Sequence, residues 1–169
     1  LRNSINRQNT YGLISKLNYD LSDALKLQLG LDWRTAGIEH AREVRDLLGG
    51  DYYVDFADDG YDPDGDGNSD PKIVRLGDKI AYSNVTTVDW LGFFGQASYS
   101  AGALSAYGMA GWSQIEYTYQ DSFTVAKAVV DHGDPITATQ LKAGAMYDLS
   151  DNLSLFADFG LVEKPPILD

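Results

Sequence analysis

Leu25-Lys26-Leu27-Gln28-Leu29-Gly30-Leu31-Asp32-Trp33 is the stretch that decides the fold, because its apolar and polar residues alternate with a period of two. The leucines and the tryptophan fall on one face of an extended strand, and the polar residues fall on the other. A tight polar turn, Asp20 to Ala24, precedes this stretch, and a similar turn returns at Asp148 to Asn152. Asp and Ser favour such turns because they hydrogen-bond their own backbone. We therefore predict a sheet with one apolar face and one polar, solvated face.

The amino-acid composition excludes several classes of function. The chain of 169 residues has a formal net charge of −12 and a sequence pI of about 4.3, which argues against a nucleic-acid partner because phosphate binding needs clustered Lys and Arg. It contains no cysteine, which excludes disulfide scaffolds and thiolate chemistry. Its 11 tyrosines and 17 glycines are typical of a β-rich protein. No run of eighteen apolar residues predicts a transmembrane helix, whereas membrane-spanning strands show only alternation.

The alternation recurs and predicts an all-β antiparallel meander of about six strands. Three short turns alternate with two long connections, so one end of the sheet has tight turns and the other has long loops. The turns lie near 21–23, 101–102 and 150–152, and the connections at 46–89 and 122–136. The predicted strands cover residues 9–20, 24–38, 90–100, 104–121, 137–149 and 153–162. The end of the second strand is left open, because Ala36 to Leu48 also carries helical spacing.

Aromatic residues recur near the strand ends. A tyrosine stands just before each tight turn, and a tryptophan lies eight or nine residues away along the strands. At about 3.3 Å per residue and a tilt near 40°, this spacing rises about 20–25 Å, close to the apolar band of an outer-membrane barrel between its aromatic girdles. The predicted membrane-interface aromatics are Tyr19, Trp33, Trp90, Tyr99, Trp112 and Tyr147. The alternative is that they form the core of a soluble antiparallel sheet.

Polar residues lie opposite the apolar faces of the predicted strands. In a barrel they would line a wet lumen, and in a soluble sheet they would form a solvated face. They are Lys16, Lys26, Arg34, Gln96, Lys142 and Asp148.

The sharpest local motif is Asp62-Pro63-Asp64-Gly65-Asp66-Gly67-Asn68-Ser69-Asp70. Its Asp and Gly spacing matches the start of an EF-hand calcium loop, but Ile73 stands where that loop needs a bidentate Glu, and no helical pattern flanks it. It is closer to the Asp-rich calcium repeats of extracellular proteins. The predicted calcium ligands are Asp62, Asp64, Asp66, Asn68 and Asp70. The alternative is a flexible acidic turn, since residues 39–89 around it hold 13 of the chain's 25 acidic residues.

No catalytic arrangement stands out. The two histidines, His40 and His132, have no metal-ligand spacing, and no serine has the context of a nucleophile elbow. We therefore predict that the chain is not an enzyme.

The sequence pattern of the strands and loops resembles that of the barrel region of TonB-dependent receptors, most closely those of Bacteroidetes-type bacteria. The residues that carry this resemblance are 33–40, 44–53, 77–82, 94–99 and 156–169. The resemblance extends over nearly the whole chain but covers only part of the family's architecture, which has a 22-stranded barrel and an N-terminal plug. The resemblance therefore implies an internal barrel segment of a larger receptor, with the plug domain outside this sequence and no signal peptide in it.

The resemblance also implies a function and a location. Such receptors lie in the bacterial outer membrane and take up scarce nutrients such as a metal chelate, a vitamin, a glycan or a peptide, with energy delivered by TonB through the plug. The implied partners are outer-membrane lipid, the plug and the remaining barrel; the substrate-binding residues stay unknown. Two alternatives remain. One is a soluble or cell-surface β-domain with a calcium-stabilised loop, and the other is a small complete outer-membrane barrel whose extra strands lie within 39–89.

Overall fold

The computed structural model describes residues 1–58, 61–123 and 130–164, and every regular element in these ranges is a β-strand. The six long strands are β1 (Arg2–Asp20), β2 (Leu25–Val44), β5 (Lys79–Ala101), β6 (Leu104–Asp121), β8 (Ile136–Ser150) and β9 (Leu153–Val162). The three short strands are β3 (Tyr53–Asp55), β4 (Lys72–Val74) and β7 (Val130–His132). The described part of the chain contains no helix with the length and hydropathy needed to cross a membrane.

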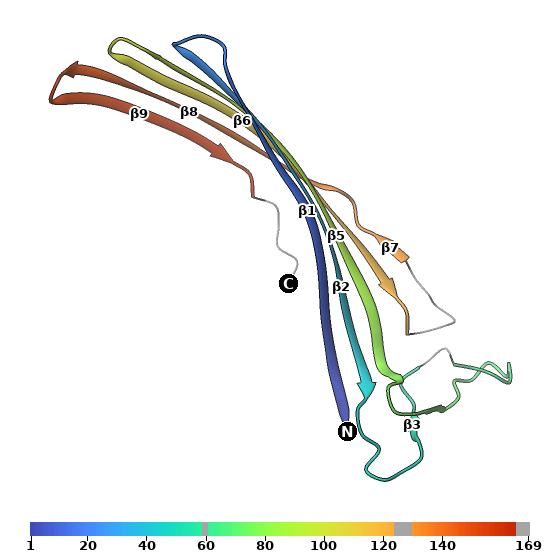
Figure 1. Ribbon diagram of the computed structural model, residues 1–169. Coiled ribbons are helices and arrows are strands. Elements are labelled where there is room, and N and C mark those ends of the chain that lie inside the picture. Colours follow the sequence, from blue (N-terminus) through green and yellow to red (C-terminus); the bar gives the residue numbers. More distant parts are fainter. Residues whose placement is uncertain (59–60, 124–129, 165–169) are drawn as a thin grey trace. The chain divides into compact units, whose positions relative to one another are not determined.

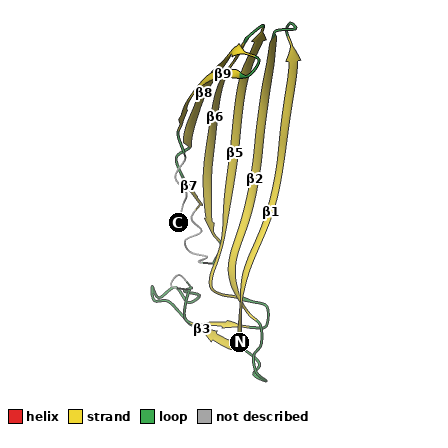
Figure 2. Ribbon diagram, turned by 90° about the vertical axis from the view of Figure 1, so that its left-hand side faces the viewer, coloured by secondary structure: helices red, strands yellow, loops and turns green. Residues whose placement is uncertain are grey.

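The long strands follow one another across a single sheet in the order β1-β2-β5-β6-β8-β9 (Figures 1 and 2). Strand β7 pairs with β6 as well, with Thr118 opposite His132. Strands β3 and β4 form a separate two-stranded antiparallel sheet. The predicted all-β antiparallel meander is therefore confirmed.

Several strands are longer than their sequence pattern indicates. Strand β1 begins at Arg2 instead of residue 9, β2 continues as a strand to Val44, and β5 begins at Lys79 instead of residue 90. Residues 79–89 include β-branched Ile, Val and Thr, which favour a strand, but they are largely polar and show no clear alternation. Within this part of β5, Ala81 has a positive φ of 67°. The connection from β2 to β5 is therefore shorter than predicted, and it contains β3 and β4.

The strand assignments also test the alternative of a small complete outer-membrane barrel, which requires extra strands within residues 39–89. Within the described part of 39–89, residues either extend β2 and β5 or form the separate β3–β4 sheet. They add no strand to the main sheet, so the extra strands required by that alternative are not found there. Of the predicted connection 122–136, residues 124–129 lie outside the described ranges, as do the closing residues 165–169.

The chain divides into two compact units, which are described separately. Unit 1 comprises Leu1–Thr10, Thr35–Val88 and Tyr117–Asp134, and unit 2 comprises Tyr11–Arg34, Asp89–Glu116 and Pro135–Asp169. The three tight turns belong to unit 2, and the β3–β4 hairpin belongs to unit 1.

The tight turns of unit 2 follow from their residues. In the first turn, the backbone N–H groups of Leu21 and Ser22 donate to the Leu25 carbonyl at 2.9 and 3.1 Å, and the Ser22 hydroxyl oxygen accepts from the Leu25 N–H at 3.1 Å. Gly102 closes the second turn with a φ of 57°, a conformation that glycine adopts without steric cost. A bulge between Asp148 and Ser150 shifts the register at the third.

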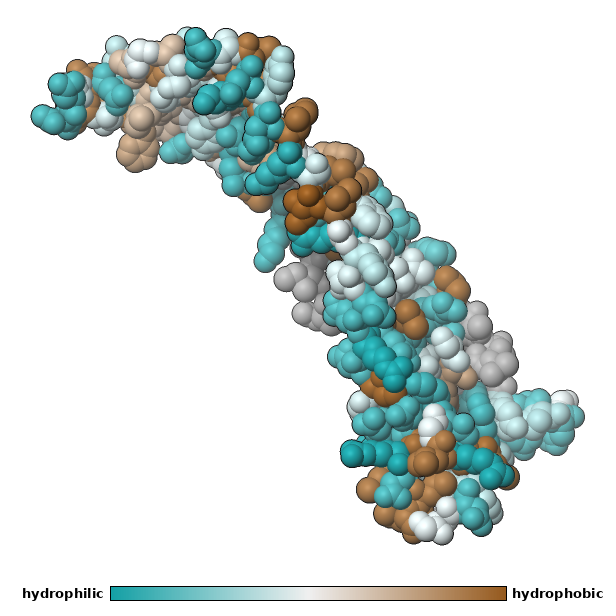
Figure 3. Space-filling model, viewed as in Figure 1, coloured by the Kyte–Doolittle hydropathy of each residue, from teal (hydrophilic) through white to brown (hydrophobic). Residues whose placement is uncertain are grey.

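Unit 1 has a small apolar core beside its hairpin. Val44, Val74 and Ile80 are buried together, and Leu47 packs against them. Figure 3 shows apolar atoms gathered over this part of the chain. The core joins the end of β2, the start of β5 and β4, and so it fixes the hairpin to the long strands of its own unit.

Candidate functional site

In unit 2 one face of the sheet is apolar. The register places Trp112 opposite Thr139 and Leu141 opposite Leu161, and the ring of Phe93 stacks on that of Trp112 with 6.2 Å between their centroids. We call this surface the apolar face; its large side chains include Tyr11, Leu13, Leu17, Leu29, Phe93, Leu104, Leu141, Leu155, Phe159 and Leu161. Many are exposed, for example Phe159 at 66 %. This face is far more apolar than a water-facing surface of a monomer normally is.

The opposite surface of unit 2, the polar face, carries hydrogen-bonded and charged groups. The Gln28 amide donates to Asn18 at 2.7 Å, and the Arg34 guanidinium donates two bonds to Asp32 at 2.7 and 2.8 Å. The Tyr107 hydroxyl donates to Asp158 at 3.2 Å. By strand alternation, this face also contains the predicted wet-side residues Lys16, Lys26, Arg34, Gln96, Lys142 and Asp148. Unit 2 is therefore a two-faced wall.

Five of the six predicted interface aromatics lie on the apolar face. Tyr147 is opposite Leu104 at the turn side, whereas Trp112 is opposite Thr139, eight positions from Tyr147 along β8. Eight tilted strand residues rise about 20 Å, which is close to the height of an apolar membrane band. The five are Tyr19, Trp33, Tyr99, Trp112 and Tyr147.

Trp90 differs from this group. Its indole nitrogen lies 3.3 Å from the place where a Cβ on Gly92 would stand, and the Ser113 side chain borders the same place. Gly92 shares its face with Phe94, which contacts Gly30 and Gly111 on the polar side. Trp90 therefore lies on the polar face, because a spacing of nine residues from Tyr99 inverts the direction of a strand side chain.

In unit 1 several odd-numbered positions of β1 and β2 carry charged or amide side chains instead of leucines. Asn3 donates to Glu43 at 3.3 Å, and Arg7 pairs with Glu39 at 3.5 Å. From β5, the Lys79 ammonium lies 3.1 Å from Glu39 and 4.0 Å from Glu43. These ion pairs form a charged ladder across three neighbouring strands.

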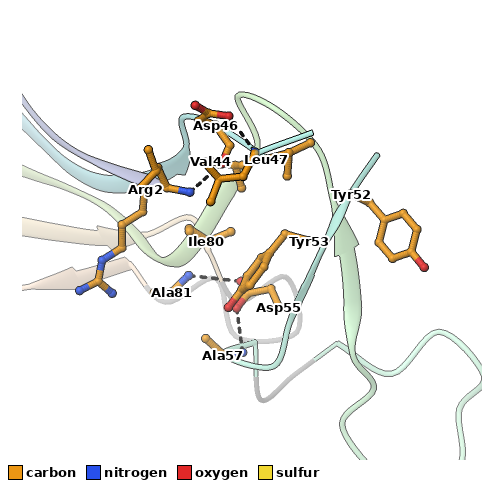
Figure 4. Close-up of a pocket in the computed structure, with 12 residues that line it drawn as sticks. Arg2, Val44, Asp46, Leu47, Tyr52, Tyr53, Asp55, Ala57, Ile80 and Ala81 are labelled. Atoms are coloured by element: carbon orange, nitrogen blue, oxygen red, sulfur yellow. Dashed lines mark hydrogen bonds between the residues drawn. The ribbon is translucent and has the colours of Figure 1, made fainter. Parts of the chain in front are cut away.

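A cavity of about 520 Å³ lies in unit 1 between the β3–β4 hairpin and the ends of the long strands (Figure 4). Apolar residues of the small core form one wall, including Val44, Leu47 and Ile80. Tyr52 and Tyr53 contribute exposed aromatic rings, and Figure 4 shows the Tyr52 ring pointing away from Asp55. The cavity thus combines an apolar wall with aromatic side chains.

Asp55 fixes the hairpin to the strand beside this cavity. It is 4 % exposed, and its carboxylate accepts hydrogen bonds from the backbone N–H groups of Ala57 at 3.2 Å and Ala81 at 3.3 Å. Ala81 has a positive φ of 67°, a conformation that costs energy for a residue with a Cβ. Asp55 is therefore a structural clamp that holds an irregular residue of β5.

Lys72 of β4 also connects the hairpin to neighbouring segments. Its ammonium lies 5.5 Å from the ring centre of Tyr61, 5.7 Å from that of Phe123 and 3.7 Å from the Asp58 carboxylate. A cation over aromatic rings is attracted by their negative faces. Lys72 therefore joins the hairpin to residues 61–70, which we call the acidic loop, and to the segment after β6.

The acidic loop bonds mainly to itself. The Asp62 carboxylate accepts N–H bonds from Gly65 at 2.7 Å, Asp66 at 3.2 Å and Gly67 at 3.0 Å. The Gly67 bond is the largest cause that lowers the pKa of Asp62. At Asp70, burial, followed by the neighbouring charges of Asp64, Asp66 and Asp62, raises the pKa.

The structure brings together only part of the predicted calcium set. Carboxylate oxygens of Asp62, Asp64 and Asp70 lie within 4.8 Å of one another. Asp66 instead accepts two bonds from Asn68, at 2.7 Å from its N–H and 3.0 Å from its side-chain amide. Because Asp62 is already occupied by three backbone donors, the geometry is that of an acidic turn stabilised by its own hydrogen bonds, and calcium is not supported.

Comparison with known proteins adds one match. The sequence model of a family described as "TonB dependent receptor-like, beta-barrel" matches residues 1–169. No curated protein and no solved structure matches the chain. The match supports the resemblance seen in the sequence, although not its Bacteroidetes-type refinement.

Proposed function

The chain belongs to the TonB-dependent receptor β-barrel family, and we propose that it forms part of the wall and outer loops of a transporter that takes up a scarce nutrient. The family consists of non-enzymatic transporters of the bacterial outer membrane. Our proposal concerns what this chain contributes: a lipid-facing surface, a lumen-facing surface and a structured outer hairpin.

The two-faced wall of unit 2 is the observation that carries the proposal. We assign the apolar face to lipid, because large exposed side chains such as Leu29 and Phe159 are stable there and costly in water. We assign the polar face to the lumen, because its ion pairs and amides need water or polar partners. The same exposed face argues against the soluble β-domain alternative.

The edges of the sheet fit a piece of a larger barrel. In the described ranges β1 and β9 are the end strands of the sheet order. Lipid cannot satisfy the unpaired N–H and C=O groups of such edges, so each needs a further strand. We therefore propose that the chain is an internal barrel segment, and that a plug domain in the remaining polypeptide contacts TonB.

The outer side of the barrel is assigned from the loops. Tight turns are typical of the periplasmic end of such barrels, and long connections are typical of the outside. We place the β3–β4 hairpin, its 520 Å³ cavity and the acidic loop outside the cell, where they meet the nutrient.

Single cysteines test this topology, because the chain has none of its own. In the full-length receptor on intact cells, a membrane-impermeant maleimide should label Asn68→Cys in the acidic loop and leave Ser22→Cys in the first tight turn unlabelled. Both variants should label after the outer membrane is permeabilised, which serves as the control. Labelling of Ser22→Cys on intact cells, or protection of Asn68→Cys, contradicts the proposal.

A further inference from the structure

Two residues with a strained backbone border the cavity of unit 1. Within the described part of the chain, a positive φ occurs outside glycine at Leu48, with 54°, and at Ala81, with 67°. Both residues line the cavity. This region of φ is unfavourable for a residue with a Cβ, and such strain persists only where the surrounding contacts impose it. The closed arrangement of the cavity therefore stores free energy at two points.

The two strained residues flank the β3–β4 hairpin in the sequence. Leu48 comes shortly after β2 ends at Val44, and Ala81 is close to the start of β5 at Lys79. The hinges of a moving element are a few loop or element-terminal residues that absorb changes of φ and ψ. Leu48 and Ala81 have this placement with respect to the hairpin.

A small set of side chains holds the hairpin in its position. Asp55 accepts the N–H of Ala81 at 3.3 Å, a bond that Figure 4 shows as a dashed line. Val74 packs in the small apolar core of unit 1, and the Lys72 ammonium lies over the ring of Tyr61. The hairpin itself consists of two strands of three residues. A hairpin of this size is not stable by itself in water, so its position depends on these contacts.

We propose that the β3–β4 hairpin is a strained lid, which exchanges between the closed position of this structure and a less populated open position. On opening, Asp55 releases the Ala81 N–H, Leu48 and Ala81 return to a negative φ, and Val74 leaves the core. The strain raises the free energy of the closed position, and so it sets the fraction of open molecules. The inference concerns a motion of unit 1 and does not depend on the proposed transport function.

A buried cysteine reports the open position. The Val74 side chain is 1 % exposed, so a thiol reagent reaches Val74→Cys only when the lid leaves the core. The rate of maleimide labelling is measured in the full-length receptor, purified in detergent without denaturant. Ile73→Cys, at a neighbouring position that is 61 % exposed, is the control for access of the reagent and should label rapidly in every variant.

Two substitutions of Ala81 should change this rate in opposite directions. Ala81→Gly removes the steric cost of the positive φ, so Val74→Cys should label about tenfold more slowly. Ala81→Val increases that cost and should accelerate labelling. Ala97→Gly, at an exposed position of β5 without a positive φ, is the matched control and should leave the rate unchanged. A rate that Ala81→Gly does not lower, or labelling of Val74→Cys only on global unfolding, overturns the proposal.

Hydrogen exchange of the unmodified receptor provides a second measurement that needs no variant. The Ala81 amide should exchange at the same rate as the hydrogen-bonded amides of the lid, because one opening exposes them together. The amide of Ala41 on β2, a residue that is 0 % exposed, should exchange more slowly. Exchange of Ala81 at the rate of Ala41 overturns the lid. Labelling of Ser22→Cys on intact cells would refute the proposed function and leave the lid unaffected.

Discussion

The phenyl ring of Phe94 on β5 fills the space beside Gly30 on β2 where any larger side chain would have to stand. A glycine at position 30 is thus a packing requirement of the polar face. It also explains why a glycine stands at this polar-face position of β2, between Gln28 and Asp32.

We expect Gly30→Ala to destabilise the receptor by about 1–3 kcal/mol, because the new methyl group overpacks against the Phe94 ring. Urea unfolding in lipid vesicles measures the change. Gly108→Ala is the matched control on β6, since no atom lies within 4 Å of its would-be Cβ. The double variant Gly30→Ala with Phe94→Ala should lose less than the sum of its single variants, and strict additivity would contradict the contact.

Two adjacent residues of β2 test the assignment of the faces. Leu29→Lys places a charge on the apolar face and should cost about 2–4 kcal/mol if it lies near the middle of the bilayer, whereas Gln28→Lys on the polar face should cost little. The readout is the fraction of receptor that assembles in the outer membrane and resists unfolding without heat. If the two substitutions reduce assembly equally, the two faces do not differ in their contact with lipid, and the assignment is wrong.

The Asp55 clamp predicts a local effect on the hairpin. Asp55→Ala removes the acceptor for the Ala57 and Ala81 N–H groups and leaves buried donors unpaired, at a cost of about 1–3 kcal/mol. Brief proteolysis of intact cells should then cut the β3–β4 connection faster. Asp51→Ala, an exposed neighbour in the same connection, is the control and should be cut at the original rate. Equal rates for all three proteins would exclude the clamp.

The acidic loop should respond to pH in two steps. Asp70, whose pKa is raised by burial and by nearby carboxylates, takes up its proton first as the pH falls, above the ordinary value of 3.8. The pKa of Asp62 is lowered chiefly by the Gly67 N–H bond, so the stabilisation it gives is complete above 3.8 and is lost only as the pH drops through its lower folded value.

The amide signal of Gly67 reports the second step by NMR of the receptor in detergent. We expect its shift to titrate below pH 3.8 in the unmodified protein, and to lose that titration in Asp62→Asn. Asp51→Asn should leave it unchanged. A Gly67 titration that persists in Asp62→Asn would show that another group controls this amide.

The strands that could be predicted from the sequence are those whose apolar and polar residues alternate clearly. The leucines of β2 and the Ser22 turn define strands and hairpins by local chemistry alone, so the meander was predicted correctly. The sequence predicts a shorter strand β5, because residues 79–89 are largely polar and do not alternate clearly between apolar and polar positions. Strands of three residues, such as β3 and β4, contain too few positions to show a period.

The aromatic–glycine contacts of the polar face and the hairpin cavity could not be predicted from periodicity. Phe94 and Gly30 are 64 positions apart in the chain, and their contact depends on the register between β2 and β5. Trp90 is predicted as an interface aromatic from its distance to Tyr99 alone, whereas the structure places it on the polar face. A count of odd and even positions from Phe93 distinguishes the face of Trp90 from that of Tyr99.

The contacts of Lys72 affect the free energy with which a ligand would bind to this part of the chain. By contacting Tyr61, Phe123 and Asp58, Lys72 restrains the hairpin and the acidic loop before any solute arrives. Immobilising a flexible side chain during association costs about 0.5–1.5 kcal/mol, and a preorganised surface avoids much of this entropy loss. The hairpin and the acidic loop are therefore ordered by folding, so that a ligand that binds them has less entropy to lose.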